Sequence, residues 1–438
     1  MTTRSHVYID GLYDLLLWLM GLVPLFYMVI RGWTNTGLII VAVVSVIECC
    51  RQVQAVKLIL KSPKVKWILL ALAMPMIAVL IGQLLRGELS IRMLDGPSRS
   101  ILAAAIFILC LLRRIKLLEY FQYSLSFSML ILVLVIHINP EPWSLWSGRF
   151  ATYFVDPLTL GDFSLIIGFM CLIMIDNKSI FSWLIWSDVL KVSACISGIY
   201  LSLGSLSRSG WVTVPVLLLL VGMRFNLRAK TMLMTYIMAT LVFIVICYFN
   251  AEVLARALSI LSEPLAWFDA QQDNDITSAG IRLGLWVLGG YLIGRQPFSG
   301  YGDRGYEVLL KNDPDIIRIA PEVVRETLLK GPHNEYISSM LHSGVVGLIA
   351  DVMLLCIPVI IVFGSRWYNA TQSKIAYMIA VLCSGLAICG MTLEVFYLKY
   401  AISFYSFMVA TLLAQFLLES QEHEQSAVRG RNADAGIQ

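Results

Sequence analysis

Charged side chains are scarce in this sequence. Asp, Glu, Lys and Arg make up only 14% of the 438 residues, 58% are hydrophobic, and the mean hydropathy is +0.77. A soluble globular protein has about 25% charged and about 45–50% apolar residues. Long apolar runs between short polar loops exclude a soluble domain and predict an all-α polytopic membrane protein. The net charge of +4 comes from basic residues scattered over loops, so we expect no nucleic-acid partner.

The sequence also lacks the patterns that hold metals, disulfides or nucleotides. All nine cysteines lie within or at the ends of apolar runs, and the five histidines form no cluster. Because zinc-type spacing and a disulfide framework are both missing, we predict no metal site and no cofactor. Gly300-Tyr301-Gly302 lacks the third glycine and the preceding strand of a dinucleotide-binding motif. No internal repeat is visible.

Apolar runs of membrane-spanning length are what the sequence has in abundance. A spanning helix needs about 20 apolar residues. About twelve segments approach this length: 11–30, 36–50, 67–85, 100–112, 120–138, 157–176, 180–203, 211–223, 231–249, 336–363, 375–393 and 400–418. The segment 180–203 contains Asp188 and Lys191, which are one helical turn apart and can neutralise each other.

Basic residues gather in alternate short loops, for example at 51–66, 113–116 and 224–230. The positive-inside rule places these loops in the cytoplasm, and an even number of spans places both termini there as well. The predicted organisation is nine spans over 1–249, a large loop with short helices on the outer side over 250–335, three more spans over 336–418 and a cytoplasmic tail over 419–438.

The large loop has helical patterns of its own. Apolar residues recur at helical spacing over 251–262, which predicts an amphipathic helix. The apolar stretch 281–294 is too short to span comfortably, so it predicts a re-entrant or interface-lying helix. A proline opens 321–330, as expected at the first turn of another short helix.

His333 is the first candidate catalytic residue. It follows Gly331-Pro332, a turn, and precedes the apolar helix predicted from Tyr336. An imidazole with an ordinary pKa of about 6.5 can accept a proton near neutral pH. The alternative is an interface histidine that hydrogen-bonds a loop carbonyl. His342, two turns further along, is interpreted as structural.

Two arginines are candidates for binding phosphate. Arg208 lies among small hydroxyl residues on the outer side, where the positive-inside rule makes arginine less expected. Arg282 opens the short apolar helix at headgroup depth, with Trp286 one turn on and Arg304 nearby in sequence. Together they predict a cationic site for phosphate or pyrophosphate. Ordinary snorkelling of Arg208 and attraction of Arg282 to anionic lipid are the alternatives.

Three motifs resemble the bacterial O-antigen ligase family, within the wider group of O-antigen ligases and polymerases. They are Ser207-Arg208-Ser209-Gly210-Trp211, the string Arg282-x-x-x-Trp286 leading to Pro297-x-x-Gly300-x-Gly302, and His333-Asn334-Glu335-Tyr336 followed by Gly344-Val345-Val346-Gly347-Leu348. The motif region covers about 200–350, and the first two hundred residues match in hydropathy only. The last motif is specific to the superfamily and does not separate ligase from polymerase.

The resemblance implies a GT-C-like, metal-independent and inverting glycosyltransferase in the bacterial inner membrane. The implied donor is a glycan on undecaprenyl pyrophosphate, and the implied acceptor is lipid A–core oligosaccharide at the periplasmic face. His333 would act as general base, and Arg208 and Arg282 would bind the pyrophosphate. The substrate contacts expected to surround them are Asn334, Tyr336, Trp286 and Arg304.

Two alternative functions remain compatible with the sequence. An O-antigen polymerase or a protein-directed oligosaccharyltransferase would differ only in the acceptor, and no acceptor motif is readable. A transporter of lipid-linked sugars would not be an enzyme at all. The concentration of polar groups on the outer side, rather than at mid-membrane, favours chemistry on a lipid-anchored substrate over its passage across the bilayer.

Overall fold

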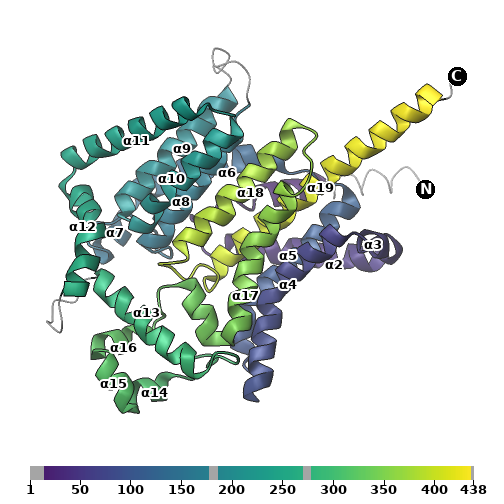
Figure 1. Cartoon of the computed structure of the whole chain (residues 1–438). Helices are drawn as coiled ribbons and strands as arrows, with labels where there is room; N and C mark the ends of the chain where they lie inside the picture. The colour runs from purple at the N-terminus through teal and green to yellow at the C-terminus, as the bar shows by residue number, and fades with distance from the viewer. Residues whose placement is uncertain (1–13, 177–185, 270–277, 436–438) are drawn as a thin grey trace.

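The computed structural model describes residues 14–176, 186–269 and 278–435, and the regular elements among them are all helices. Figure 1 shows a bundle of long helices with several short ones gathered at one end. The helices are α2 (Trp33–Arg51), α3 (Val53–Ile59), α4 (Pro63–Arg86), α5 (Ile91–Arg113), α6 (Leu118–Ile138), α7 (Glu141–Leu145), α8 (Pro157–Ile173), α9 (Trp186–Ser205), α10 (Arg208–Arg224), α11 (Ala229–Phe249), α12 (Ala251–Asp269), α13 (Ser278–Arg295), α14 (Glu307–Asn312), α15 (Pro314–Ile319), α16 (Glu322–Leu328), α17 (Glu335–Phe363), α18 (Ala370–Cys389) and α19 (Lys399–Ala435).

The predicted class, an all-α polytopic membrane protein, is confirmed. Eight of the described helices are long and apolar enough to cross a membrane, namely α2, α4, α5, α6, α11, α17, α18 and α19. The apolar helix α8 is shorter, at 17 residues. The first predicted span, 11–30, begins outside the described residues; 14–22 are helical and turns follow over 23–29. The count of twelve spans stays a prediction.

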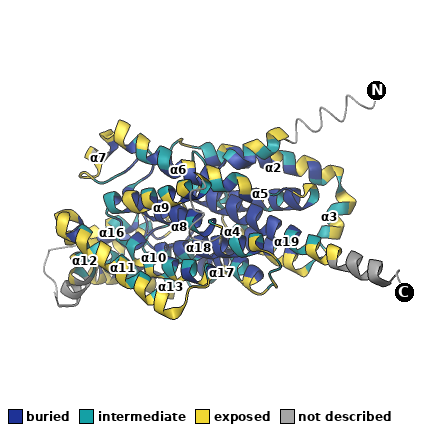
Figure 2. Ribbon diagram, turned by 90° about the horizontal axis from the view of Figure 1, so that it is seen from above, coloured by how far each residue is buried: buried dark blue, intermediate teal, exposed yellow. Residues whose placement is uncertain are grey.

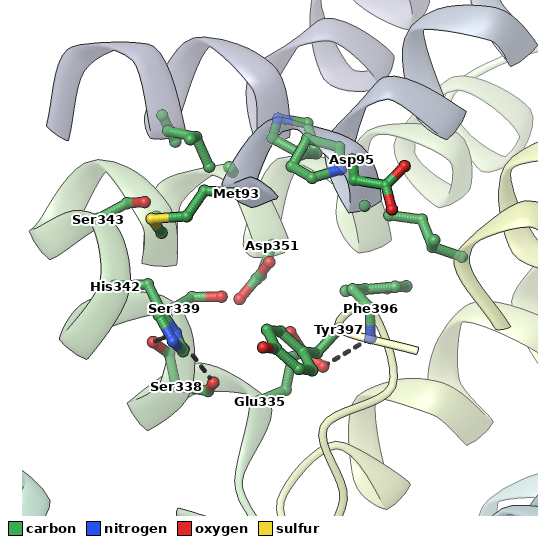
Figure 3. A pocket seen from close by; sticks show the side chains of 18 of the residues that line it. Met93, Asp95, Glu335, Ser338, Ser339, His342, Ser343, Asp351, Phe396 and Tyr397 are labelled. Carbon is green, nitrogen blue, oxygen red and sulfur yellow. Dashed lines mark hydrogen bonds between the residues drawn. The ribbon is translucent and has the colours of Figure 1, made fainter. Parts of the chain in front are cut away.

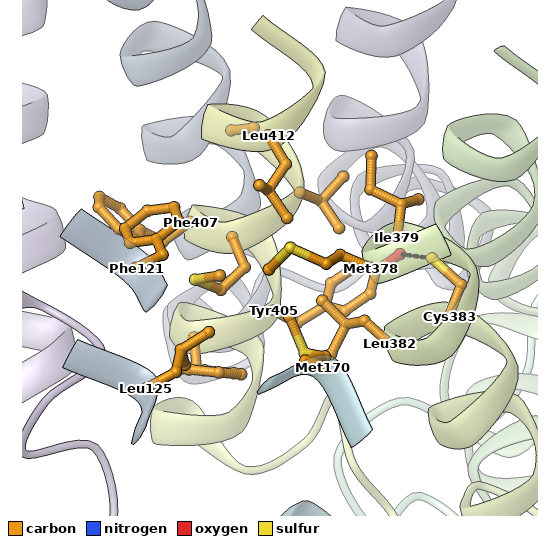
Figure 4. Close-up of a cluster of buried hydrophobic side chains, with 14 of the residues drawn as sticks. Phe121, Leu125, Met170, Met378, Ile379, Leu382, Cys383, Tyr405, Phe407 and Leu412 are labelled. Atoms are coloured by element: carbon orange, nitrogen blue, oxygen red, sulfur yellow. Dashed lines mark hydrogen bonds between the residues drawn. The ribbon is translucent and has the colours of Figure 1, made fainter. Parts of the chain in front are cut away.

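The hydrophobic core centres on α19, which is apolar on every side between residues 401 and 418 and is buried throughout. A helix that is hydrophobic all round must be covered on all faces. Helices α5, α18 and α2 pack against it. Figure 4 shows Phe121 of α6, Met170 of α8 and Tyr405 of α19 within one buried cluster. The dense centre and the exposed periphery are both visible in Figure 2.

Helix α11 has the opposite relation to the rest of the protein. Its most apolar window has a mean hydropathy of 2.3, yet only 6% of that window is buried. It packs against α10 and α12 alone among the elements with substantial contacts. An apolar helix surface that protein does not cover is stable only in lipid, so most of the α11 surface faces the bilayer.

The buried ion pair predicted in α9 is present. Lys191 Nζ lies 3.0 Å from Asp188 Oδ1 and donates a further bond to the Met174 carbonyl at 3.3 Å. The two charges are therefore compensated at the point where they interrupt the apolar segment.

The segment predicted as one continuous span from 336 to 363 is folded into two limbs. Gly344 has φ 66° and ψ −159°, which breaks the helix into 335–343 and 345–363. The limbs pack closely, because a Cβ on Gly347 would lie 2.3 Å from the Ser339 carbonyl oxygen. Only the second limb, with 19 residues at 1.5 Å each, is long enough to cross the membrane.

The Pro297–Gly302 turn is packed against this reversal. Val345 donates its N–H to the Pro297 carbonyl at 2.8 Å, and Tyr301 donates to the Leu341 carbonyl at 2.6 Å. A Cβ on Gly300 would meet the Gly344 nitrogen at 2.7 Å. The glycines of two distant motifs therefore permit one close backbone contact, which a side chain on either would prevent.

The helices of the 250–335 segment form a small layer of their own. A second buried cluster joins α13 to α14, α15 and α16, and includes Leu288, Tyr306 and Val324. The predicted helices over 251–262, 281–294 and 321–330 correspond to α12, α13 and α16. Helix α13 also packs on α17, so this layer rests on the first limb.

We predict that Gly344→Ala destabilises the protein by several kcal/mol. A non-glycine residue at this φ and ψ costs about 1–3 kcal/mol, and the new Cβ would lie 2.2 Å from the Phe298 carbonyl oxygen. Thermal unfolding in nanodiscs measures the effect. Gly290→Ala is the matched control, because nothing lies within 4 Å of a Cβ there. Equal melting temperatures for the two variants would contradict the role of Gly344.

Candidate active site

Arg208, Arg282 and His333 come from three separate motifs and meet at one place. Arg208 begins α10, Arg282 is the fifth residue of α13, and His333 precedes α17. The positive charge of Arg208 acts on Arg282, and that of Arg282 acts on His333. The geometry therefore assembles the three residues that the sequence nominates.

Asp162 of α8 holds the start of α10 in place. Its carboxylate accepts hydrogen bonds from Ser207 Oγ at 2.7 Å and from Ser209 Oγ at 2.9 Å. A Cβ on Gly210 would lie 3.0 Å from Asp162 Oδ1, so the glycine allows the close approach. The small residues around Arg208 thus fix the helix end from which its side chain extends.

Arg208 is directed toward α12 and α13. Its guanidinium lies 3.1 Å from Glu263 Oε1 and donates to Ser259 Oγ at 2.7 Å and Ser278 Oγ at 2.8 Å. Glu263 also accepts the Ala279 N–H at 3.0 Å, and so caps the first turn of α13. One carboxylate therefore ties Arg208 to the helix that carries Arg282.

Two further arginines complete a cluster of positive charge. Burial lowers the pKa of Arg149 to about 10, and the charges of Arg256, Arg282 and Arg208 add to this effect. Burial also lowers the pKa of Arg282, as do Arg208 and Arg256. We call Arg149, Arg208, Arg256 and Arg282 the arginine cluster. Guanidinium groups repel one another, so this arrangement favours an anion among them.

Local backbone geometry restricts His333 to one position. Its φ is 48°, an uncommon left-handed value for histidine. Its N–H donates to Glu394 Oε1 at 3.0 Å, and Gly331 makes room, since a Cβ there would lie 2.1 Å from that oxygen. Burial lowers the pKa of His333, and the Arg282 charge lowers it further, while Asp156 opposes them. The imidazole is thus kept neutral, the form that accepts a proton.

The residues after His333 anchor it. Asn334 caps α17 by accepting the Ile337 N–H at 3.1 Å and donates to the Met391 carbonyl. Glu335 accepts the Phe396 N–H at 2.7 Å, and Tyr336 donates to the Ala387 carbonyl at 2.7 Å. Asn334 and Tyr336, expected to touch substrate, therefore have protein partners that join α17 to the end of α18.

The remaining two expected contacts lie in different surroundings. Trp286 is half-buried one turn from Arg282, and its indole nitrogen is buried with no hydrogen-bond partner among the described residues. Arg304 is exposed on a turn with φ 69°, beside the loop that packs on the far end of the first limb. Trp286 thus lies close to the arginine cluster, whereas Arg304 lies on the surface of the layer formed by the short helices α13 to α16.

Several site residues were not nominated from the sequence. Asp162 could have been nominated, because an ionisable residue inside a membrane-spanning apolar segment is a candidate functional residue. Arg149, Arg256, Asp156 and Glu394 have no such signal, because they lie in ordinary polar loops or on an amphipathic helix. Only the folding of distant segments brings them beside His333 and Arg208.

The fold and this site define a polytopic membrane protein with a cluster of arginines and a neutral histidine at one end of its helix bundle. Residues 193–351 match the sequence model of the family described as O-antigen ligase. This matched segment contains Arg208, Arg282 and His333, and the match supports the O-antigen ligase family within the O-antigen ligase and polymerase superfamily. That family implies, in general terms, a glycosyltransferase-like ligase activity on lipid-linked glycans. No curated protein matches the chain.

We predict that replacing Glu394 changes how stability depends on pH. Burial raises the pKa of Glu394 to about 7 from its ordinary 4.5. The folded protein therefore binds this proton more tightly than the unfolded chain, and wild-type stability falls as pH rises between 4.5 and 7. Glu394→Gln removes the titration, so its melting temperature relative to wild type should increase over that window, by an amount equivalent to about 1–3 kcal/mol.

The measurement is thermal unfolding of both proteins in nanodiscs between pH 4.5 and pH 8. His333 titrates in both and cancels in the difference. A difference in melting temperature between the two proteins that stays constant over this pH range would show that Glu394 is not protonated in the folded state.

Proposed function

We propose that this protein is an O-antigen ligase. It transfers a glycan from undecaprenyl pyrophosphate to lipid A–core oligosaccharide, at the periplasmic face of the bacterial inner membrane, with both termini in the cytoplasm. The observation that carries the proposal is the arginine cluster beside His333. Like charges that are half-buried close together are costly without an anionic partner, and a pyrophosphate on a lipid is an anion of suitable charge and depth.

The arginine cluster supports the departure of the leaving group. As the bond between the anomeric carbon and the phosphate oxygen breaks, negative charge grows on the pyrophosphate. Arg208 and Arg282 are already oriented by Glu263 and by helix ends, so they stabilise this charge without rearranging. One such preorganised donor is commonly worth about 3–4 kcal/mol. In this proposal arginines replace a divalent ion, and the reaction is metal-independent.

His333 supports the attack by the acceptor. Its neutral imidazole removes the proton from an acceptor hydroxyl, whose oxygen then bonds to the anomeric carbon from the side opposite the pyrophosphate. One displacement of this kind inverts the anomeric configuration. The hydrogen bond from His333 N–H to Glu394 fixes the backbone from which the ring extends.

The exposed flank of α11 provides a route for the polyprenyl chain. The helix is apolar, is almost uncovered, and leads into α12, which carries Arg256 and Glu263. A lipid tail lying along α11 would bring its pyrophosphate to the arginine cluster.

We expect His333→Ala to lower kcat by about 10²–10⁴, and Arg208→Gln or Arg282→Gln to lower it by about 10²–10³. Arg318→Gln is the matched control, since Arg318 is an exposed arginine on α15 paired with Asp315. The assay uses purified protein in nanodiscs, the polyprenyl-pyrophosphate-linked glycan, lipid A–core and a chelator, with products separated on a gel.

Each result of this assay has a distinct meaning. Glycan on the core despite the chelator, lost in the His333 variant, supports the ligase. Lengthening of the donor alone indicates a polymerase. No product from wild type, with substrates that a known ligase uses, contradicts the enzyme and turns attention to transport.

A pH profile tests the base. Because the pKa of His333 is lowered, the acidic limb of kcat/KM should have its midpoint below 6.5. Arg282→Gln removes one cause of that lowering, so the midpoint of its residual activity should move upward, while Arg318→Gln should leave it unchanged. A wild-type midpoint above 6.5 would contradict the assignment of His333.

A further inference from the structure

A cavity of about 300 Å³ lies beside the candidate active site and is separate from the arginine cluster. It is enclosed by α4, α5, both limbs of α17 and the segment that joins α18 to α19. Much of its wall is apolar, formed by residues such as Val79, Ala350 and Ile402. Neither His333 nor any member of the arginine cluster lines it, but Glu335, two residues after His333, does.

Asp351 is the most informative residue in this cavity. It is only 5% exposed, and its Oδ2 atom has no hydrogen-bond partner among the described residues. Figure 3 shows its carboxylate directed into the open space between the helices. Glu335, by contrast, accepts the Phe396 N–H at 2.7 Å. A buried carboxylate oxygen without a donor is unfavourable, so this geometry favours a ligand that donates hydrogen bonds.

An aromatic surface lies on the same cavity. Tyr397 is 56% exposed, and its ring stacks on His342 with centroids 5.8 Å apart and an interplanar angle of 17°. His342 is held in turn by a hydrogen bond from its Nδ1 to the Ser338 carbonyl at 2.7 Å. The cavity therefore presents an oriented, accessible ring together with a carboxylate acceptor.

The charges at its rim are already paired. Arg92 lies 3.4 Å from Asp303, and Lys399 forms an ion pair with Asp95. Each of these two cations therefore has an anionic partner other than Asp351. The described residues also contain no group of three side chains suited to a metal ion. The lining thus fits a neutral molecule with hydroxyl donors and a less polar face.

We propose that this cavity binds one sugar residue of the saccharide substrate. Asp351 accepts hydrogen bonds from the sugar hydroxyls, and Tyr397 packs against the C–H face of the ring. Small-molecule sites commonly combine an aromatic or apolar surface with a few polar groups that fix the orientation of the ligand. The proposal rests on the proposed glycosyl transfer. Donor and acceptor both carry sugars of this chemistry, and the experiment separates them.

The cavity and the candidate active site share a hydrogen-bonded connection. Ser338 Oγ lies 3.4 Å from Glu394 Oε2 and 3.3 Å from His342 Nδ1, and Glu394 accepts the His333 N–H. A sugar against Tyr397 would thus rest on the limb that His333 precedes. Binding there orients the saccharide relative to the base.

The test measures initial rates while donor and acceptor are titrated in turn. Asp351→Asn keeps the shape of the site but replaces one carboxylate oxygen with an NH2 donor, so we expect KM for one substrate to rise about tenfold, with kcat changed less than threefold. Tyr397→Ala should raise the same KM, and Tyr397→Phe should preserve it. Glu322→Gln, at an exposed carboxylate on α16, is the matched control.

The substrate whose KM rises identifies the source of the sugar. Unchanged KM values in both Asp351→Asn and Tyr397→Ala, with melting temperatures like that of wild type, would overturn the proposal. A loss of kcat at constant KM would overturn it too. Because Tyr397 is exposed, its variants should fold even if Asp351→Asn does not.

A binding experiment separates this proposal from the proposed function. Saturation-transfer NMR with free core oligosaccharide and free glycan fragments needs no catalysis. If wild type transfers no glycan but binds one of these saccharides, and Tyr397→Ala or Asp351→Asn abolishes the signal, the sugar site stands and the ligase proposal falls. If no saccharide gives a signal with an active wild-type enzyme, the sugar site falls and the ligase proposal stands.

Discussion

The close backbone contact between Gly344 and the Pro297–Gly302 turn decides much of the architecture. It reverses α17, which places the first limb against the second and leaves the helix start with His333 at the edge of the bundle. The same contact connects the outer layer of short helices to the spanning bundle through Val345 and Tyr301. The position of His333 and the position of the short-helix layer that carries Arg282 thus both depend on the contact between Gly344 and Gly300, where a side chain would not fit.

Electrostatics has a second organising role. Asp162, Glu263 and Glu394 each hold a backbone or side chain of the candidate active site rather than pointing into it. These carboxylates partly offset the arginine cluster and orient it, while burial keeps the repulsion between its members strong. The result is a rigid, cationic surface beside a neutral imidazole, which suits a reaction whose leaving group gains negative charge.

In our proposals, the start of α17 contributes to catalysis and its second limb contributes to saccharide binding. The segment before the first limb carries the proposed base, and Asp351 of the second limb, with its unpartnered oxygen, lines the cavity that α17 encloses together with α4 and α5. Glu394 and Ser338 lie between them and contact both sides. A saccharide substrate and a lipid pyrophosphate would therefore approach the same short helix from different directions.

The sequence by itself determined the class of the protein, the short helices near 251–262, 281–294 and 321–330, and the nomination of Arg208, Arg282 and His333. Hydropathy, helical periodicity and motif spacing are local properties, so they can be read from the chain. Only the tertiary structure decided that α17 reverses at Gly344, that Arg149 and Arg256 join the arginine cluster, and that Asp351 faces a cavity. These features arise from contacts between segments far apart in the chain, where backbone fit and the combined field of several charges have no local signature.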